Sequence, residues 1–185
     1  ALKKNIFFKY SKTPSKKKLN ILITKNIREY LRKEFDIILN CAAISKVKEC
    51  ERNPKLANKI NVLGVKNLVN EILRYEKRTK KNVLLIHISS DAVYSPNKGN
   101  NRERSRLSPY NVYGKTKLRS EKIVGKLQRH MIIRTRFFDK NKIKFNDAAT
   151  DIFSSMLEVQ ELVKSLIFLI KIRYNGIINV GGPRE

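Results

Sequence analysis

Glycine is scarce in this sequence. Seven of the 185 residues are glycine, and the first of them is Gly64. A glycine-rich turn near the amino terminus lets backbone N–H groups and a helix end approach a dinucleotide pyrophosphate, and no such turn occurs in these residues. Gly181 and Gly182 follow the last expected strand, so they cannot serve as the glycine-rich turn near the amino terminus.

The sequence also lacks paired cysteines and long apolar runs. Its two cysteines, Cys41 and Cys50, show no CxxC or Cys/His spacing, so we expect free thiols and neither a disulfide nor a metal site. Charged residues interrupt the most apolar stretch, 157–178, which excludes a membrane span there. The apolar patch at 6–8 is too short for a signal peptide. We therefore expect a cytoplasmic protein.

Acidic residues are few. The chain has 16 Asp plus Glu against 41 Lys plus Arg, which gives a formal net charge of +25. Such a charge suits nucleic-acid binding, because cations that neutralise phosphates supply most non-specific affinity. However, the basic clusters at 16–18, 77–81 and 102–106 are separated and have no interleaved aromatic residues for base stacking. We interpret the charge mostly as a solvated surface, with salt-dependent duplex binding as an alternative.

The residues that are present predict a globular α/β domain. A hydrophobic fraction of 41%, with eight Phe and seven Tyr, is enough for a core. Expected strands are 6–10, 36–41, 83–89, 131–135 and 176–180, and expected helices are 24–33, a long one from 54 through 72, 108–127 and 158–172. Because strands and helices alternate, we expect a Rossmann-like parallel sheet with helices on both faces and ligands at the carboxyl ends of the strands.

Tyr113 and Lys117 lie four residues apart on an expected helix, so both point to one face. A nearby ammonium favours phenolate, so we expect Lys117 to lower the pKa of Tyr113 and to make it an acid-base group. By itself such a pair also arises by chance on amphipathic helices. Ser90 directly follows a buried strand, where its hydroxyl would meet a ligand or would cap a turn.

Four motifs in a fixed order strengthen this interpretation. They are 40–43 after one strand, 88–94 after the next, 111–117 on a helix and 134–136 after a third strand. Together they resemble the extended short-chain dehydrogenase/reductase family, within which they are most similar to the dTDP-4-dehydrorhamnose reductases. The resemblance runs from Ile6 to Gly182.

The resemblance implies an NAD(P)-binding domain with a Ser/Thr-Tyr-Lys catalytic set and a nucleotide-sugar substrate. Carried over by motif, Ser90 polarises the substrate carbonyl and Tyr113 gives the proton. Lys117 tunes Tyr113 and holds the nicotinamide ribose, and Asp91 lies with Ser90 and Tyr113 at the substrate. In the family's dehydratases an acidic pair follows the hydroxyl residue, whereas Ala92 follows Asp91 here, which favours a reductase over an epimerase or dehydratase.

The same resemblance supplies the cofactor residues at the strand ends. Cys41, Ala42 and Ala43 match the small residues that let the cofactor approach one strand end, and Ser89 lies at the next. Asn61 matches a supporting position on the long helix, although a surface asparagine would fit the sequence equally well.

Cofactor choice depends on the segment that resembles the family's second strand. Ser11 and Lys12 follow it with a hydroxyl and a cation, which accept a 2′-phosphate, so we expect NADP rather than NAD. His87 and His130 are interpreted as packing or turn residues.

The missing glycine turn leaves several alternatives open. We expect a fragment or degenerate copy of a longer reductase, with a partial NAD(P)-binding domain at 1–138 and a partial substrate-binding region at 139–185. The rival from another class is a non-catalytic family member that acts as a binding subunit. A homodimer is left open.

Overall fold

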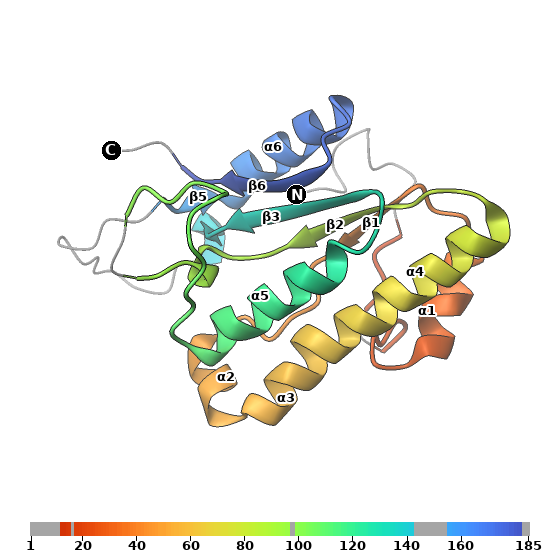
Figure 1. Ribbon diagram of the computed structural model, residues 1–185, viewed down its shortest axis with the longest axis horizontal. Helices are drawn as coiled ribbons and strands as arrows, with labels where there is room; N and C mark the ends of the chain where they lie inside the picture. The colour runs from red at the N-terminus through yellow and green to blue at the C-terminus, as the bar shows by residue number, and fades with distance from the viewer. Residues whose placement is uncertain (1–11, 16, 97–98, 143–154, 183–185) are drawn as a thin grey trace.

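A four-stranded parallel sheet forms the centre of the molecule (Figure 1). The computed structural model describes residues 12–15, 17–96, 99–142 and 155–182. The strands are β1 (Ile37–Asn40), β2 (Leu84–Ile88), β3 (His130–Thr135) and β6 (Gly176–Val180), and they lie side by side in this order. The expected strand at 6–10 falls outside the described residues.

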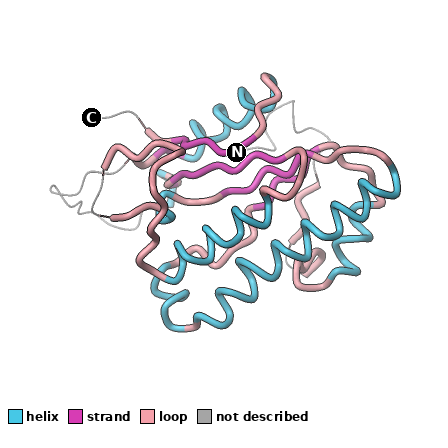
Figure 2. Tube along the Cα trace, viewed as in Figure 1, coloured by secondary structure: helices cyan, strands magenta, loops and turns pink. Residues whose placement is uncertain are grey.

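Helices cover both faces of the sheet, as Figure 2 shows. Their bounds are α1 (Thr24–Leu31), α2 (Val47–Arg52), α3 (Pro54–Asn58), α4 (Val65–Thr79), α5 (Val112–Val124) and α6 (Val159–Lys171). Helix α6 lies on one face, and α4 and α5 lie on the other. The Rossmann-like parallel sheet expected from the sequence is therefore confirmed.

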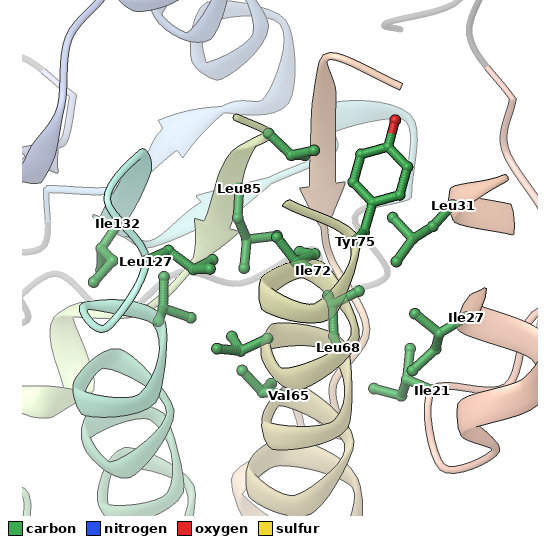
Figure 3. Close-up of a cluster of buried hydrophobic side chains, with 13 residues drawn as sticks. Ile21, Ile27, Leu31, Val65, Leu68, Ile72, Tyr75, Leu85, Leu127 and Ile132 are labelled. Atoms are coloured by element: carbon green, nitrogen blue, oxygen red, sulfur yellow. The ribbon is translucent and has the colours of Figure 1, made fainter. Parts of the chain in front are cut away.

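The strands are apolar on both sides because each side is covered. Leu85 and Ile132 point into a cluster that includes Ile72 of α4 (Figure 3). On the opposite face, Ile86 packs in a cluster with Leu166 of α6. Burying one such side chain contributes about 1.5–3 kcal/mol, so the two clusters hold the sheet between its helices.

The long helical segment is interrupted by a π-helical turn, Lys59–Gly64, between α3 and α4. It begins as expected, since the Asn53 side chain accepts a hydrogen bond from Leu56 N and Pro54 occupies the first turn. Single-turn π-helices often mark functional sites, and this one carries Asn61.

Helix α5 begins four residues later than expected. Asn111, not Ser108, caps it by accepting a hydrogen bond from Gly114 N at 2.7 Å. The Ser108 N–H instead bonds to Val93 O at 3.1 Å in the preceding loop. Helix α2 and the short pair β4 (Phe137–Phe138) with β5 (Leu157–Glu158) are further elements that the sequence pattern did not indicate.

The position of the last strand changes the expected division of the chain into 1–138 and 139–185. Strand β6 pairs with β3 from Met131–Gly176 to Thr135–Val180, so residues 176–180 complete the main sheet. The assignment of the remainder of 139–185 to substrate binding stays a prediction, and 143–154 and 183–185 lie outside the described residues. Among the residues that are described, no helix has the length and apolarity to span a membrane.

Candidate active site

The candidate site lies where β2 ends and α5 begins. After β2, Ser90 caps the 3-10 turn Asp91–Val93 by accepting a hydrogen bond from Ala92 N at 3.2 Å. Helix α5 packs directly against this turn at Gly114. A Cβ at Gly114 would lie 2.2 Å from the Ala92 carbonyl oxygen, so only glycine permits the approach that brings Tyr113 beside Ser90.

Tyr113 is half-buried on the first turn of α5. Burial raises the pKa of its phenol, a hydrogen bond with Ser90 acts in the opposite direction, and the Asp91 charge raises the pKa further. The expectation that Lys117 lowers this pKa is wrong for this structure, because burial raises the pKa and Lys117 is not among the groups that shift it. The phenol stays protonated at neutral pH and can give a proton.

The hydroxyl of Ser90 already has a partner. It donates a hydrogen bond to Asp91 Oδ1 at 3.1 Å, and Asp91 Oδ2 forms an ion pair with Arg136 Nε at 2.9 Å. Asp91 is therefore held beside Ser90 and faces the cation that follows β3. To donate to a substrate carbonyl, the Ser90 O–H must turn away from Asp91.

Lys117 is buried one helical turn after Tyr113. Its ammonium donates a hydrogen bond to Ile88 O at 2.6 Å, at the end of β2. Burial lowers the pKa of Lys117 to about 8, although the nearby Glu121 carboxylate acts in the opposite direction. The side chain is thus a fixed cation directly beneath the carboxyl edge of the sheet.

Ser89 has a different environment from Ser90. Its hydroxyl donates to Glu121 Oε1 at 2.5 Å, and Glu121 forms a buried ion pair with Arg134, whose Nη2 lies 2.7 Å from Oε2. The Ser89 side chain therefore points into the protein interior, and its contact with a cofactor stays a prediction.

The end of β1 presents small residues beside Lys117. Cys41 and Ala42 are exposed and Ala43 is half-buried. Asn40 Oδ1 accepts a hydrogen bond from Ala42 N at 3.1 Å, which fixes the turn.

Asn61 holds Ile44, the residue that follows Ala43, through its backbone. Its Oδ1 accepts from Ile44 N at 2.8 Å, and its Nδ2 donates to Ile44 O at 3.1 Å and to Thr116 Oγ1 at 3.0 Å. Asn61 is buried, so the alternative of a surface asparagine is wrong.

The sequence did not predict that three residues near the site, Asn40, His87 and Ser120, lie together. They form a buried chain of hydrogen bonds beneath Lys117. A polar residue within the apolar run 83–89 was the available signal for His87. Of the two residues expected to select the cofactor, Lys12 is exposed and Ser11 falls outside the described residues.

Comparisons with known proteins show which family this chain resembles. The family model described as RmlD substrate binding domain matches residues 7–162. The dTDP-4-dehydrorhamnose reductase of Salmonella typhimurium is 34% identical over 115 residues, which are 60% of this chain and 36% of that protein. Methionine adenosyltransferase 2 subunit beta of Xenopus tropicalis is 35% identical over 88 residues, 48% of this chain and 25% of that protein. The matches thus span about a third or less of these relatives.

Solved structures share the fold over more of their length. A Bacillus anthracis dTDP-4-dehydrorhamnose reductase in complex with NADP superposes with a TM-score of 0.82 at 22% identity, covering 98% of this chain and 70% of that one. A hypothetical dTDP-4-dehydrorhamnose reductase from Sulfolobus tokodaii gives a TM-score of 0.74 at 29% identity, with coverage of 90% and 63%.

Proposed function

Because the chain belongs to the RmlD substrate-binding domain family, we propose that it carries the catalytic residues of an NADPH-dependent reductase of a 4-keto nucleotide sugar. The observation that supports this most is the meeting of Ser90, Tyr113 and Lys117 at one edge of the sheet. They come from the end of β2 and from the start of α5, held together by the close approach at Gly114.

The direction of the pKa shift on Tyr113 suits reduction. A phenol that remains protonated is ready to give its proton to the oxygen of a keto group as that oxygen gains negative charge. Ser90 donates a second hydrogen bond to the same oxygen once its O–H turns from Asp91. When bound, NADPH supplies the hydride that adds to the keto carbon, so the products are an alcohol and NADP.

The described residues fit the nicotinamide end of such a cofactor. Lys117 provides a buried ammonium for the ribose hydroxyls, and Cys41, Ala42 and Ala43 leave space at the adjacent strand end. Residues 1–63 contain no glycine for a pyrophosphate turn. We therefore assign the nicotinamide end to Lys117 and to the end of β1. For the 2′-phosphate we propose Ser11 and Lys12, as the residues that favour NADP over NAD.

Finer parts of the proposal rest on sequence and burial. Ser89 borders the cofactor through its backbone, Asp91 lies beside the substrate, and the region 139–185, apart from β6, contributes substrate contacts. We also propose a cytoplasmic location, which is supported by two free thiols, the exposed Cys41 and the buried Cys50.

The test is NADPH oxidation in the presence of a 4-keto nucleotide sugar. Tyr113→Phe should lower turnover by about 10²–10⁴-fold, because it removes the proton donor. Tyr110→Phe is the matched control, since Tyr110 lies three residues earlier and is 65% exposed. Turnover of Tyr113→Phe at the wild-type rate would contradict the proposal, and sugar conversion without net NADPH oxidation would favour an epimerase or dehydratase.

A second candidate is a binding subunit without turnover. It is favoured by the 35% identity to methionine adenosyltransferase 2 subunit beta. This role predicts that the wild-type chain gives no NADPH oxidation with any 4-keto nucleotide sugar.

A further inference from the structure

His87 is 1% exposed and lies in the middle of the polar contacts beneath the active site. It belongs to β2, three residues before Ser90, and pairs in register with Asn40 of β1. Around its ring are Asn40 Nδ2 at 3.0 Å from Nδ1, Ser120 Oγ at 2.9 Å from Nε2 and Lys117 Nζ at 3.3 Å from Nε2. The imidazole ring therefore contacts β1 through Asn40 and α5 through Ser120 and Lys117.

The orientation of Asn40 determines which ring nitrogen carries the proton. Asn40 Oδ1 already accepts a hydrogen bond from Ala42 N at 3.1 Å, so its amide NH₂ group faces His87 Nδ1. An NH₂ group only donates, so Nδ1 must accept. In a neutral imidazole the proton then lies on Nε2.

The Nε2 side accommodates that proton. Ser120 Oγ donates its own hydrogen to Lys117 O at 2.7 Å, which leaves its lone pairs free to accept from His87 Nε2–H. The donors thus run in one direction, from Asn40 through His87 and Ser120 to the backbone of α5.

The charge of Lys117 requires the imidazole to be neutral. The ammonium cannot donate to a protonated Nε2, so its hydrogen bond goes to Ile88 O at 2.6 Å. An imidazolium this close would repel it. In agreement, burial and the Lys117 charge lower the pKa of His87 well below its ordinary value.

We propose that His87 is a positioning residue of the active site, a neutral imidazole protonated on Nε2 that ties the 40–42 turn to α5 and directs the Lys117 ammonium to Ile88 O. This inference rests on the proposed reductase function for its catalytic consequence but not for its geometry. His87 touches neither substrate nor cofactor in this role. It acts by holding two segments that do.

The geometry is tested by nitrogen NMR of the wild-type chain labelled in histidine. The sequence has two histidines, so His130→Gln assigns both signals. We expect His87 to be neutral with its proton on Nε2 at neutral pH, and to gain a second proton only below the ordinary histidine midpoint of about 6.5. A His87 proton on Nδ1, or a midpoint at or above the ordinary value, would overturn the proposal.

The positioning role is tested with two substitutions. His87→Leu removes both hydrogen bonds, whereas His87→Gln can accept from Asn40 and donate to Ser120. Displacement of a reactive group costs roughly 10–100-fold in rate, so kcat should fall by about that factor in His87→Leu with little change in KM, and His87→Gln should recover most of it. Wild-type kcat in the leucine variant would overturn the proposal.

A readout without turnover separates this inference from the reductase assignment. The Lys117 ammonium, titrated by NMR, should have the same midpoint in His87→Gln as in the wild-type chain. The midpoint should change in His87→Leu, because the leucine no longer holds the ammonium at Ile88 O. An unchanged midpoint in His87→Leu would overturn the positioning role. If the wild-type chain has no turnover, that result contradicts only the proposed reductase function. The two NMR measurements then test the positioning role of His87 independently.

Discussion

At Gly114 the absence of a side chain sets how closely α5 approaches the turn after β2. Gly114→Ala would place a methyl group 2.2 Å from the Ala92 carbonyl oxygen, against backbone that cannot move independently. We expect the free energy of unfolding to fall by about 1–3 kcal/mol, which is typical of overpacking. Urea denaturation measures this loss.

Gly125→Ala provides the matched control at the other end of α5. A Cβ at Gly125 would lie 3.4 Å from Glu121 O, and the residue already has right-handed helical backbone. We expect the free energy of unfolding to stay equal or to rise by about 0.5–1 kcal/mol. Equal losses in both variants would show that the contact with Ala92 is not the cause.

The sequence predicts which residues gather at the candidate site better than it predicts their surroundings. Motif and spacing single out Ser90, Tyr113 and Lys117, and the structure places Ser90 beside Tyr113, whereas their catalytic roles stay a prediction. The pKa direction of Tyr113 is not predictable in this way, because burial depends on what packs over the phenol. The role of His87 is likewise not predictable, because the sequence shows only a histidine within an apolar strand. Its partners Asn40 and Ser120 come from separate elements.

Among the elements, the π-helical turn between α3 and α4 fixes the segment after β1 through Asn61. Asn61→Ala removes three hydrogen bonds and leaves the N–H and C=O of Ile44 without that partner. We expect a loss of about 2–4 kcal/mol in unfolding free energy and faster hydrogen exchange at the Ile44 amide.

Asn70→Ala is the control for that substitution, since Asn70 is exposed on α4. Its effect should be within about 0.5 kcal/mol. An Ile44 amide that exchanges at the wild-type rate in Asn61→Ala would contradict the role given to the π-helical turn.

Element boundaries show where periodicity is informative. Strands β1, β2, β3 and β6 are found because each is a short apolar run between turn residues. The start of α5 is misplaced because Ser108-Pro109 and Asn111 are both good helix-start signals, and only the hydrogen bond to Gly114 N distinguishes them. Helix α2 has six residues, too few for a clear apolar period.

At the scale of the whole molecule, folding brings a net charge of +25 together in a compact chain of 185 residues. Like charges repel more in the compact state than in the unfolded chain, and salt screens this repulsion. We expect the urea midpoint to rise as sodium chloride is increased to about 0.15 M, where the Debye length is about 8 Å. A midpoint independent of salt would contradict this expectation and would mean that repulsion between the basic side chains contributes little to the free energy of unfolding.

The order of the four strands in the sheet is also their order in the chain. Each of β2, β3 and β6 pairs with the strand of this sheet that precedes it in sequence. During synthesis, every new strand therefore meets a partner that has already left the ribosome, and the sheet can grow by one strand at a time. The residues at the end of β2, on α5 and just after β3 can therefore come together before β6 has been made.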